Sequence, residues 1–579
     1  MTGVTEMNTE KTVRGKASVE KPWLQYYPEA LRNFVPSEDT LADFIHKNNP
    51  DHDRPCIEFY GKTFSYNEII AERDKVAKSL LTLGVKEGDQ LVVILRAVPE
   101  FIFVLLAAEK VGASIVCHDG EPEERAAAIR DAKAKVVFSN EFITKEDEAL
   151  YFKDSDLESL ILVSPYTYAV KEEIPDYVGT AIEKLYSESR PADERTLQWN
   201  DFLKKGEALE NEVYPEKNPD RHLYCSYTSG STGPSKQVIH SARSMNGVLA
   251  QLVIPGGYGF SMKVLHTLLP PALVAIANSI LLFNIALGNH LVLSPFCEAE
   301  DIDLEFMRYN PNQMIAVPMM AEILMSSSRI PADYSMKDLY VIGGGADPVH
   351  NKWLRRIQSF LRSHGSSAVF SMCYGLSEAG STVANPRPNA DFRNCGGGIP
   401  MRGTTISIFE AGTHNELDYG EIGEICTHGP SSMLGYSTQE ETDKTLQLHE
   451  DGKLWVHTGD YGYMNQFGEL FVYSRGLNKR FGGGCLYTTV MENKVIDVTG
   501  VEDCFFVIVP DVEHEGFFVP YLYVVPEKGV ELKNIEADIR KQLEEYEQPK
   551  EIFVTPKREY FHFKTNRRIL AGKILNGEH

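Results

Sequence analysis

Residues 227–236 have the composition of a loop that binds phosphate. Seven of these ten residues are Ser, Thr or Gly, and Lys236 closes the stretch. Small side chains let backbone N–H groups approach a ligand, hydroxyls add hydrogen bonds, and the lysine adds positive charge. The alternative is a flexible Ser/Gly linker, which the apolar segments on both sides disfavour. We therefore expect phosphate oxygens to be held by Thr228, Ser229, Gly230, Ser231, Thr232, Gly233 and Lys236.

The spacing of this loop differs from that of a Walker A loop. Gly230 and Gly233 are three residues apart, and Lys236 follows Ser235 instead of a glycine. A Walker A loop requires two glycines five residues apart, with lysine directly after the second. The chemistry therefore points to phosphate binding outside the Walker class.

Residues 374–378 are a second group with chemical potential. The ring of Tyr374 can stack on a base, Ser377 offers a hydroxyl, and the Glu378 carboxylate can hold Mg²⁺. Gly375 is a further candidate for cofactor binding in this group. The alternative is a surface turn with an incidental acid.

Three further positions fit a nucleotide site. Asp460 can accept both hydrogen bonds of a ribose diol, and Arg475 can supply a second ribose or phosphate contact. Gly344, Gly345 and Ala346 follow an expected strand, at the kind of strand end where α/β proteins bind ligands. For Gly344, Gly345 and Ala346, the alternative is a plain strand-to-loop turn.

In this order, the motifs resemble those of the adenylate-forming enzymes: acyl-CoA synthetases, peptide-synthetase adenylation domains and luciferases. The resemblance covers about residues 23–570. It implies that Tyr374 stacks on adenine, that Glu378 binds Mg²⁺, and that residues 344–346 lie against adenine and the acyl group. The catalytic residues it implies are Lys564, Thr228 and Glu378.

The catalytic lysine has two candidates. Adenylate formation needs a cation where negative charge develops on the carboxylate and the α-phosphate. Lys564 fits the family's frame, with Phe563 where glycine is usual. Lys573 is the competitor, since it keeps the glycine–lysine pair with Gly572.

At the expected hinge between the large and small domains the chain has Asn478, where the family usually has Asp or Lys.

Composition limits the class of protein. At 579 residues the chain is expected to form two to four structural units. Its net charge of −24 argues against nucleic acid or an anionic membrane as partner. Nine cysteines without a C-x-x-C pair favour a reducing cytoplasm. No signal peptide is expected, and the apolar run 271–287 is interpreted as a buried helix.

The pattern of elements predicts an α/β fold. Strands alternate with helices from residue 66 onward, which favours a parallel sheet covered on both faces. Short strands with Gly, Asp and Asn turns indicate a small β-rich subdomain at about 400–474. We predict a disordered N-terminus at 1–22, a large domain at 23–474 with parallel α/β subdomains, and a small mobile α+β domain at 475–579.

These features predict an AMP-forming acyl-CoA synthetase that uses ATP, Mg²⁺ and coenzyme A. The expected substrate is a medium- or long-chain fatty acid, because residues 268–296 are strongly apolar, with a bulky or aromatic acid as second choice. Two alternatives stay open: a ligase that loads a separate carrier protein, and a catalytically degenerate sensor of nucleotide or acyl-CoA. The oligomeric state stays open.

Overall fold

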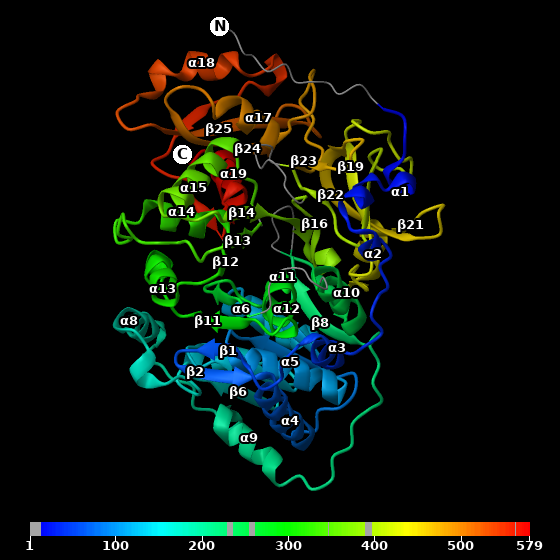
Figure 1. The fold of residues 1–579 in the computed structure, drawn as a ribbon, viewed down its shortest axis with the longest axis vertical. Coiled ribbons are helices and arrows are strands. Elements are labelled where there is room, and N and C mark those ends of the chain that lie inside the picture. Colours follow the sequence, from blue (N-terminus) through cyan, green and yellow to red (C-terminus); the bar gives the residue numbers. More distant parts are fainter. Residues whose placement is uncertain are drawn as a thin grey trace.

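The computed structural model describes residues 13–228, 235–253, 261–345, 347–387, 396–561 and 563–578. Six predicted site residues lie outside these ranges: Ser229, Gly230, Ser231, Thr232, Gly233 and Ala346. The chain runs from a lower α/β body, through a β-rich flank, to a C-terminal unit at the upper end of Figure 1.

The first large sheet has eight strands in the order β20-β9-β8-β4-β3-β5-β6-β7. The strands from β8 to β7 run parallel, while β20 and β9 add antiparallel neighbours. The central strands are buried on both faces, as continuous apolar runs require. Its strands are β3 (Gln90–Ile94), β4 (Ser114–Cys117), β5 (Val136–Asn140), β6 (Ser159–Val163), β7 (Thr196–Gln198), β8 (His222–Tyr227), β9 (Gln237–Ser241) and β20 (Gly435–Tyr436).

Helices with clear sequence signals cover this sheet. Helix α4 (Tyr66–Thr82) begins with a capping box between Ser65 and Glu68. Helix α5 (Pro99–Val111) has proline at its start and ends at Gly112 in the left-handed region. These helices and α6 (Pro122–Asp131) lie in the region, from residue 66 onward, where the sequence predicts helices alternating with strands.

The second large sheet has seven strands in the order β14-β13-β12-β10-β11-β1-β2. Only the β1–β2 pair is antiparallel. Helices α14 (Pro318–Ser326) and α15 (Asn351–Ser363) lie beside one end of it (Figure 1). Its strands are β1 (Pro55–Phe59), β2 (Lys62–Ser65), β10 (Lys263–His266), β11 (His290–Leu293), β12 (Gln313–Ile315), β13 (Val341–Gly344) and β14 (Val369–Met372). The predicted parallel α/β architecture is confirmed.

The apolar run 271–287 forms a buried helix with an inserted π-helical segment. It comprises α11 (Val274–Ile276), the π-helix Ala277–Leu282 and α12 (Phe283–Ala286). Among the described residues, no helix is both long and apolar enough to cross a membrane. Most residues of the run are buried, as predicted.

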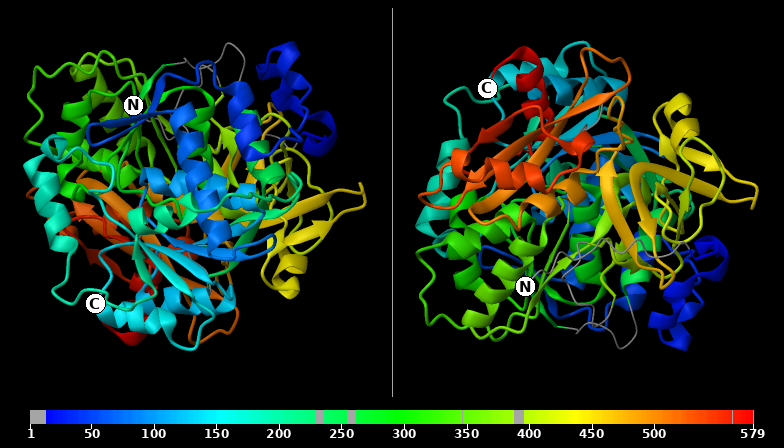
Figure 2. Two further views of the ribbon diagram at one scale, coloured as in Figure 1. Left: turned by 90° about the horizontal axis from the view of Figure 1, so that it is seen from below. Right: turned by 90° about the horizontal axis from the view of Figure 1, so that it is seen from above.

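The β-rich subdomain is a five-stranded sheet in the order β18-β19-β22-β21, with β23 also paired to β22. It forms the yellow flank that projects from the body in Figure 2. Its strands are β18 (Thr405–Phe409), β19 (Gly423–His428), β21 (Leu446–Leu448), β22 (Leu454–Met464) and β23 (Leu470–Arg475).

The prediction of disorder at 1–22 is wrong for residues 13–22. They include α1 (Ala17–Glu20) and lead into a 3-10 helix, Pro22–Tyr26. Ala17 and Trp23 are buried in a hydrophobic cluster with the β-rich subdomain. Lys16 also pairs with Asp418 at 2.8 Å. The polar composition hid Ala17, the buried apolar residue of this segment.

The C-terminal unit has a hydrophobic cluster that draws on residues 486–552 alone. A three-stranded sheet, β24 (Val501–Pro510), β25 (Phe518–Pro526) and β26 (Ile552–Val554), is flanked by α17 (Thr488–Val495) and α18 (Glu536–Lys541). A short hairpin, β27 (Tyr560–Phe561) and β28 (Lys564–Thr565), precedes α19 (Arg567–Asn576). This unit lies against α15 and β14 in Figure 1.

Candidate active site

Asp460 lies in a bulge of β22. Cys426 pairs with His457 and Glu424 pairs with Tyr461, so three residues of β22 face Ile425 alone. Gly459 has a φ of 70°, which a side chain would strain. The Thr458 hydroxyl donates to the Ile425 carbonyl at 2.7 Å and accepts from the Asp460 N–H at 3.0 Å. A bulge of this kind re-aims the side chain that it carries.

Three predicted nucleotide-binding residues meet at this bulge. The Tyr374 hydroxyl, on β15 (Tyr374–Leu376), donates to Asp460 Oδ2 at 2.8 Å. Arg475 is the cross-strand partner of Asp460, with Nη1 3.7 Å from Oδ1. Burial raises the pKa of Asp460, and the Arg475 charge opposes that rise. The carboxylate is therefore held by an aromatic hydroxyl and a cation from two different sheets.

Glu378 is buried at the turn after β15, in the short helix Ser377–Ala379. Its Oε1 accepts a 2.6 Å hydrogen bond from the Tyr436 hydroxyl. Beside it, His240 Nε2 donates to the Ser377 carbonyl at 2.8 Å. Burial lowers the pKa of His240 to about 4, so this imidazole is neutral at neutral pH. The sequence reasoning assigned no role to His240 or Tyr436.

The described ends of the predicted phosphate loop are joined by hydrogen bonds. The Thr228 N–H donates to the Lys236 carbonyl at 2.9 Å, and the Lys236 N–H donates to the Thr228 hydroxyl at 3.0 Å. The Lys236 ammonium pairs with Glu441 and lies 5.1 Å from the centre of the Tyr436 ring. Since Tyr436 also contacts Glu378, it connects the phosphate loop to the Tyr374–Glu378 motif.

Lys564 reaches the same site from the C-terminal hairpin. Burial lowers the pKa of Lys564, and the charges of Asp347, Asp460 and Glu378 oppose that effect. Arg475 also lies within electrostatic range. Lys573, by contrast, lies on α19 with its side chain exposed to solvent. The structure therefore groups Lys564, and not Lys573, with the predicted site residues.

Asp347 fixes the hairpin to the large domain. Its Oδ2 accepts from the Thr565 N–H at 3.0 Å, and Arg567 Nη1 lies 3.4 Å from its Oδ1. Phe563, beside Lys564, has a φ of 65° and packs against the main hydrophobic cluster of the large domain. The sequence reasoning missed Asp347, although an acid directly after the Gly344–Ala346 turn was a usable signal.

Gly344 and Gly345 are explained by strand packing. A Cβ on Gly344 would lie 2.0 Å from the Ala316 carbonyl oxygen, on the segment after β12. A Cβ on Gly345 would lie 2.9 Å from the Cys373 carbonyl oxygen. The close approach of neighbouring backbones therefore requires both glycines, and their contacts with adenine and the acyl group stay predictions.

Comparison with protein families identifies the class. A family described as AMP-binding enzyme matches residues 44–437. This match spans more than half of the chain, so the chain belongs to the AMP-binding enzyme family. The predicted resemblance to adenylate-forming enzymes is confirmed at this level.

Curated relatives cover nearly the whole chain. A 4-coumarate–CoA ligase from Arabidopsis thaliana is 25% identical over 571 residues, covering 94% of this chain and 94% of that protein. A 4-coumarate–CoA ligase from Humulus lupulus is 24% identical over 559 residues, covering 94% and 95%. Both relatives are named CoA ligases.

Solved structures share the fold. An anthranilate CoA ligase in complex with anthranoyl-AMP has a TM-score of 0.76 at 16% identity, covering 94% of this chain and 99% of that one. The O-succinylbenzoate coenzyme A synthetase from Bacillus subtilis, in complex with ATP and magnesium ion, has a TM-score of 0.69 at 19% identity, with 92% and 99% covered. At these identities the likeness concerns the fold alone.

Proposed function

We propose that this protein is an AMP-forming acyl-CoA ligase that activates an apolar carboxylic acid. The observation that carries the proposal is the position of Lys564. The C-terminal Lys564 lies within electrostatic range of Glu378, Asp460 and Arg475, which belong to separate motifs of the chain. A partly buried cation near the predicted nucleotide-binding motifs suits a reaction that builds negative charge on a phosphate.

The first half-reaction joins the acid to AMP. A carboxylate oxygen of the acid attacks the α-phosphorus of ATP, and the bond to pyrophosphate breaks. Lys564 stabilises the charge on the carboxylate and the α-phosphate, while Asp460 and Arg475 hold the ribose. Thr228 and Lys236 hold the leaving phosphates. To do so, the Lys236 ammonium leaves its ion pair with Glu441 and binds phosphate oxygens instead.

Glu378 is suited to hold Mg²⁺ in this half-reaction. Its buried carboxylate has Tyr436 on Oε1, and carboxylate oxygens are hard ligands of the kind that Mg²⁺ prefers. When bound, the ion would offset the charge of the phosphates. The Tyr436 hydroxyl keeps the carboxylate oriented toward the Lys236 side of the site.

The second half-reaction transfers the acyl group to coenzyme A. The thiol attacks the acyl carbonyl of the adenylate, and AMP leaves. We propose that the C-terminal unit rotates about residues 475–478 between the two steps. In support, several of its contacts with the large domain are polar: His350 and Asp503 lie 2.9 Å apart, and Lys352 and Glu527 lie 3.0 Å apart. Polar interfaces between domains are typical of units that move.

The acid is apolar in this proposal, and two classes compete. The buried π-helix Ala277–Leu282 lies beside β16 (Ser381–Asn385), which follows the Glu378 motif, and π-helical segments are frequent at functional sites. An apolar helix there supports either a fatty or an aromatic acid. The names of the curated relatives favour an aromatic acid, whereas the sequence favoured a medium- or long-chain fatty acid.

A panel of acids tests the proposal. Pyrophosphate release is measured with ATP, Mg²⁺ and each acid, from fatty acids of increasing length to benzoate and cinnamate derivatives. We expect release that depends on one class of apolar acid. If none of these acids supports release, the proposal is wrong.

The acceptor is tested separately. We expect acyl-CoA to form when coenzyme A is supplied and the acyl-adenylate to accumulate when it is omitted. A carrier protein that accepts the acyl group while coenzyme A does not would replace this assignment by carrier loading. We place the reaction in the cytoplasm, and the eight described cysteines, all free thiols, support that location.

A further inference from the structure

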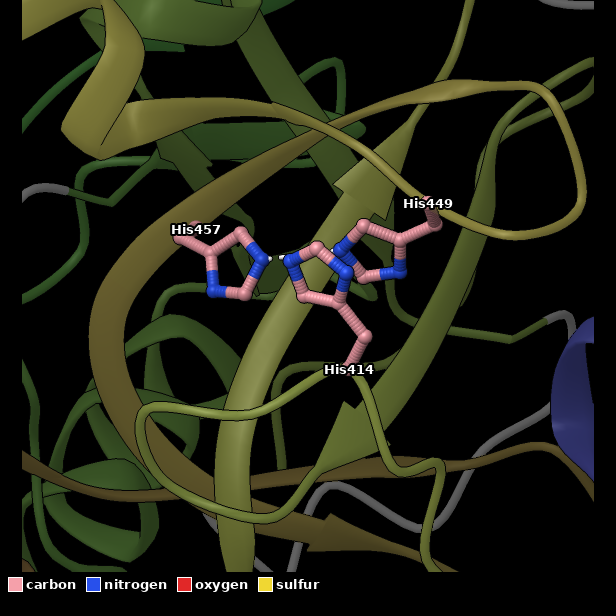
Figure 3. Close-up of side chains that lie close together, drawn as sticks. All are labelled: His414, His449 and His457. Carbon is pink, nitrogen blue, oxygen red and sulfur yellow. Dashed lines mark hydrogen bonds between the residues drawn. The ribbon is translucent and has the colours of Figure 1, made fainter.

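Three histidines gather on the β-rich subdomain, from three separate segments. His414 lies in the turn between β18 and β19, His449 follows β21, and His457 lies within β22 (Figure 3). One nitrogen from each ring lies within 4.8 Å of the others. His449 Nε2 and His457 Nε2 are 2.9 Å apart, and the rings of His414 and His449 stack with centroids 4.1 Å apart.

From this geometry we propose that His414, His449 and His457 form a binding site for a divalent transition metal of the Zn²⁺ type. Neutral imidazole is the protein ligand that suits Zn²⁺, Cu²⁺ and Ni²⁺. Three histidines with an open fourth position form a recurrent zinc arrangement. The site is separate from the Mg²⁺ position proposed at Glu378.

The hydrogen bonds around the histidines assign their tautomers. His457 Nδ1 donates to Glu424 Oε2 at 3.0 Å, so its Nε2 carries a lone pair. His414 Nε2 donates to Gln447 Oε1 at 2.9 Å, which leaves its Nδ1 lone pair free for a metal. His449 offers Nε2 to the metal once its proton resides on Nδ1.

The surroundings resemble those of a built metal site. Metal-binding histidines commonly donate their other ring N–H to a carboxylate, as His457 does to Glu424. The buried wall is aromatic: Phe409 and Trp455 lie 4.8 Å and 5.6 Å from the His449 ring. The turn that carries His414 is held by backbone hydrogen bonds between residues 410 and 415.

Only a small movement is needed to close the site on an ion. Two nitrogens bound to tetrahedral Zn²⁺ at about 2.0–2.1 Å lie roughly 3.4 Å apart. The distance of 2.9 Å between His449 Nε2 and His457 Nε2 is slightly shorter than this value. The three ligand nitrogens lie within 4.8 Å of one another, so the remaining distances can exceed it. Rotation of the exposed His414 ring out of its stack, by on the order of 1 Å, would meet this geometry.

A second set of donors, Glu424, Cys426 and His457, is a weaker candidate. In this set, His457 Nδ1 already donates a hydrogen bond to Glu424. Burial raises the pKa of the Cys426 thiol, so it is not the thiolate that a metal binds. We therefore assign the ion to the Nε2 side of His457.

Glu424 connects the histidine site to the bulge that carries Asp460, the proposed ribose-binding residue. Glu424 accepts from His457 through Oε2 and from the Gly459 N–H through Oε1 at 3.1 Å. Gly459 is the neighbour of Asp460. A metal on His457 would strengthen the His457–Glu424 bond and so restrain the bulge that positions Asp460.

The test uses the full chain, freed of metal by a chelator and titrated with Co²⁺ or Zn²⁺ alone. We expect one Co²⁺ per chain with the visible absorption of a four-coordinate ion, displaced by Zn²⁺. Replacing the exposed His414 by Gln should abolish that absorption without unfolding the protein. The matched control is His428→Gln, in the same sheet but outside the cluster, which should bind as the wild type does.

Glu424→Gln tests the connection to the bulge. It keeps the shape of the side chain and should weaken metal binding about 10- to 100-fold, as removal of such partners does in other proteins. The proposal is wrong if the wild type binds no Co²⁺ or Zn²⁺, or if His414→Gln binds as tightly as His428→Gln. None of these measurements uses ATP or an acid, so they are independent of the proposed ligase activity.

Discussion

Two lysines nine residues apart have opposite environments. Lys564 lies on the β27–β28 hairpin among the carboxylates of the large domain, whereas Lys573 lies exposed on α19. Sequence context favoured Lys573 in one respect, since only it follows a glycine. The difference shows that the contacts of the hairpin, and not the local motif, decide which lysine reaches the site.

Exchanging each lysine for alanine is the strongest test of this comparison. Lys564→Ala should lower the rate of adenylate formation by about 10²- to 10³-fold, because a cation that faces developing charge is lost. Lys573→Ala should leave the rate unchanged. Acid-dependent exchange of pyrophosphate into ATP measures both. A large loss in Lys573→Ala alone would reverse the assignment.

Removing the anchor of the hairpin should have the next largest effect. Asp347→Ala deletes the acceptor of Thr565 and the partner of Arg567, so Lys564 loses its fixed position. We expect adenylate formation to fall by about 10- to 100-fold, since small misplacements of catalytic groups cost rates of this order. Thioester formation from added acyl-adenylate should change little. An equal loss in both half-reactions would indicate a general defect of folding.

The pH dependence sharpens the comparison. Burial lowers the pKa of Lys564, so this side chain loses its charge at a lower pH than an ordinary lysine does. For the free enzyme, kcat/KM for adenylate formation should therefore fall as pH rises through that pKa. Lys564→Arg should move this fall to higher pH, because arginine stays protonated. An unchanged alkaline limb in this variant would assign the fall to another group.

Phe563→Gly should have the smallest effect, because two changes oppose each other. Glycine relieves the left-handed backbone at φ 65°, worth about 1–2 kcal/mol. It also removes a ring that packs on the large-domain core, a loss of similar size. We expect adenylate formation to change by less than about threefold, with thioester formation favoured relative to the wild type. Comparing the two half-reaction rates in both proteins measures this shift.

The strands and helices of the large domain were predictable because their signals are local. Continuous apolar runs such as residues 159–163, and the proline and glycine that bound α5, correctly indicate buried strands and a helix. The ordered segment 13–22 was missed because its buried residue, Ala17, packs in a cluster made largely of residues about 400 positions away.

The site was predictable in parts, residue by residue, but not in its connections. Asp460 and Arg475 were identified as a pair from their chemistry, and they are cross-strand partners. The bulge that aims Asp460 was not foreseen, because it depends on the register with β19. Tyr436 and Asp347 link motifs that are distant in the sequence. The spacing of apolar residues along the chain does not predict contacts of this kind.

The charged pairs between the two units imply a response to salt. Arg355 and Asp497 pair at 3.0 Å with both side chains more than half exposed, whereas Arg567 and Asp347 pair at 3.4 Å with Asp347 buried. Dissolved ions screen exposed pairs strongly, over a distance of about 10 Å at 0.1 M ionic strength. Added salt should therefore release the outer edge of the C-terminal unit first. In the rotation proposed above, ionic strength would therefore set how long the C-terminal unit stays against the large domain.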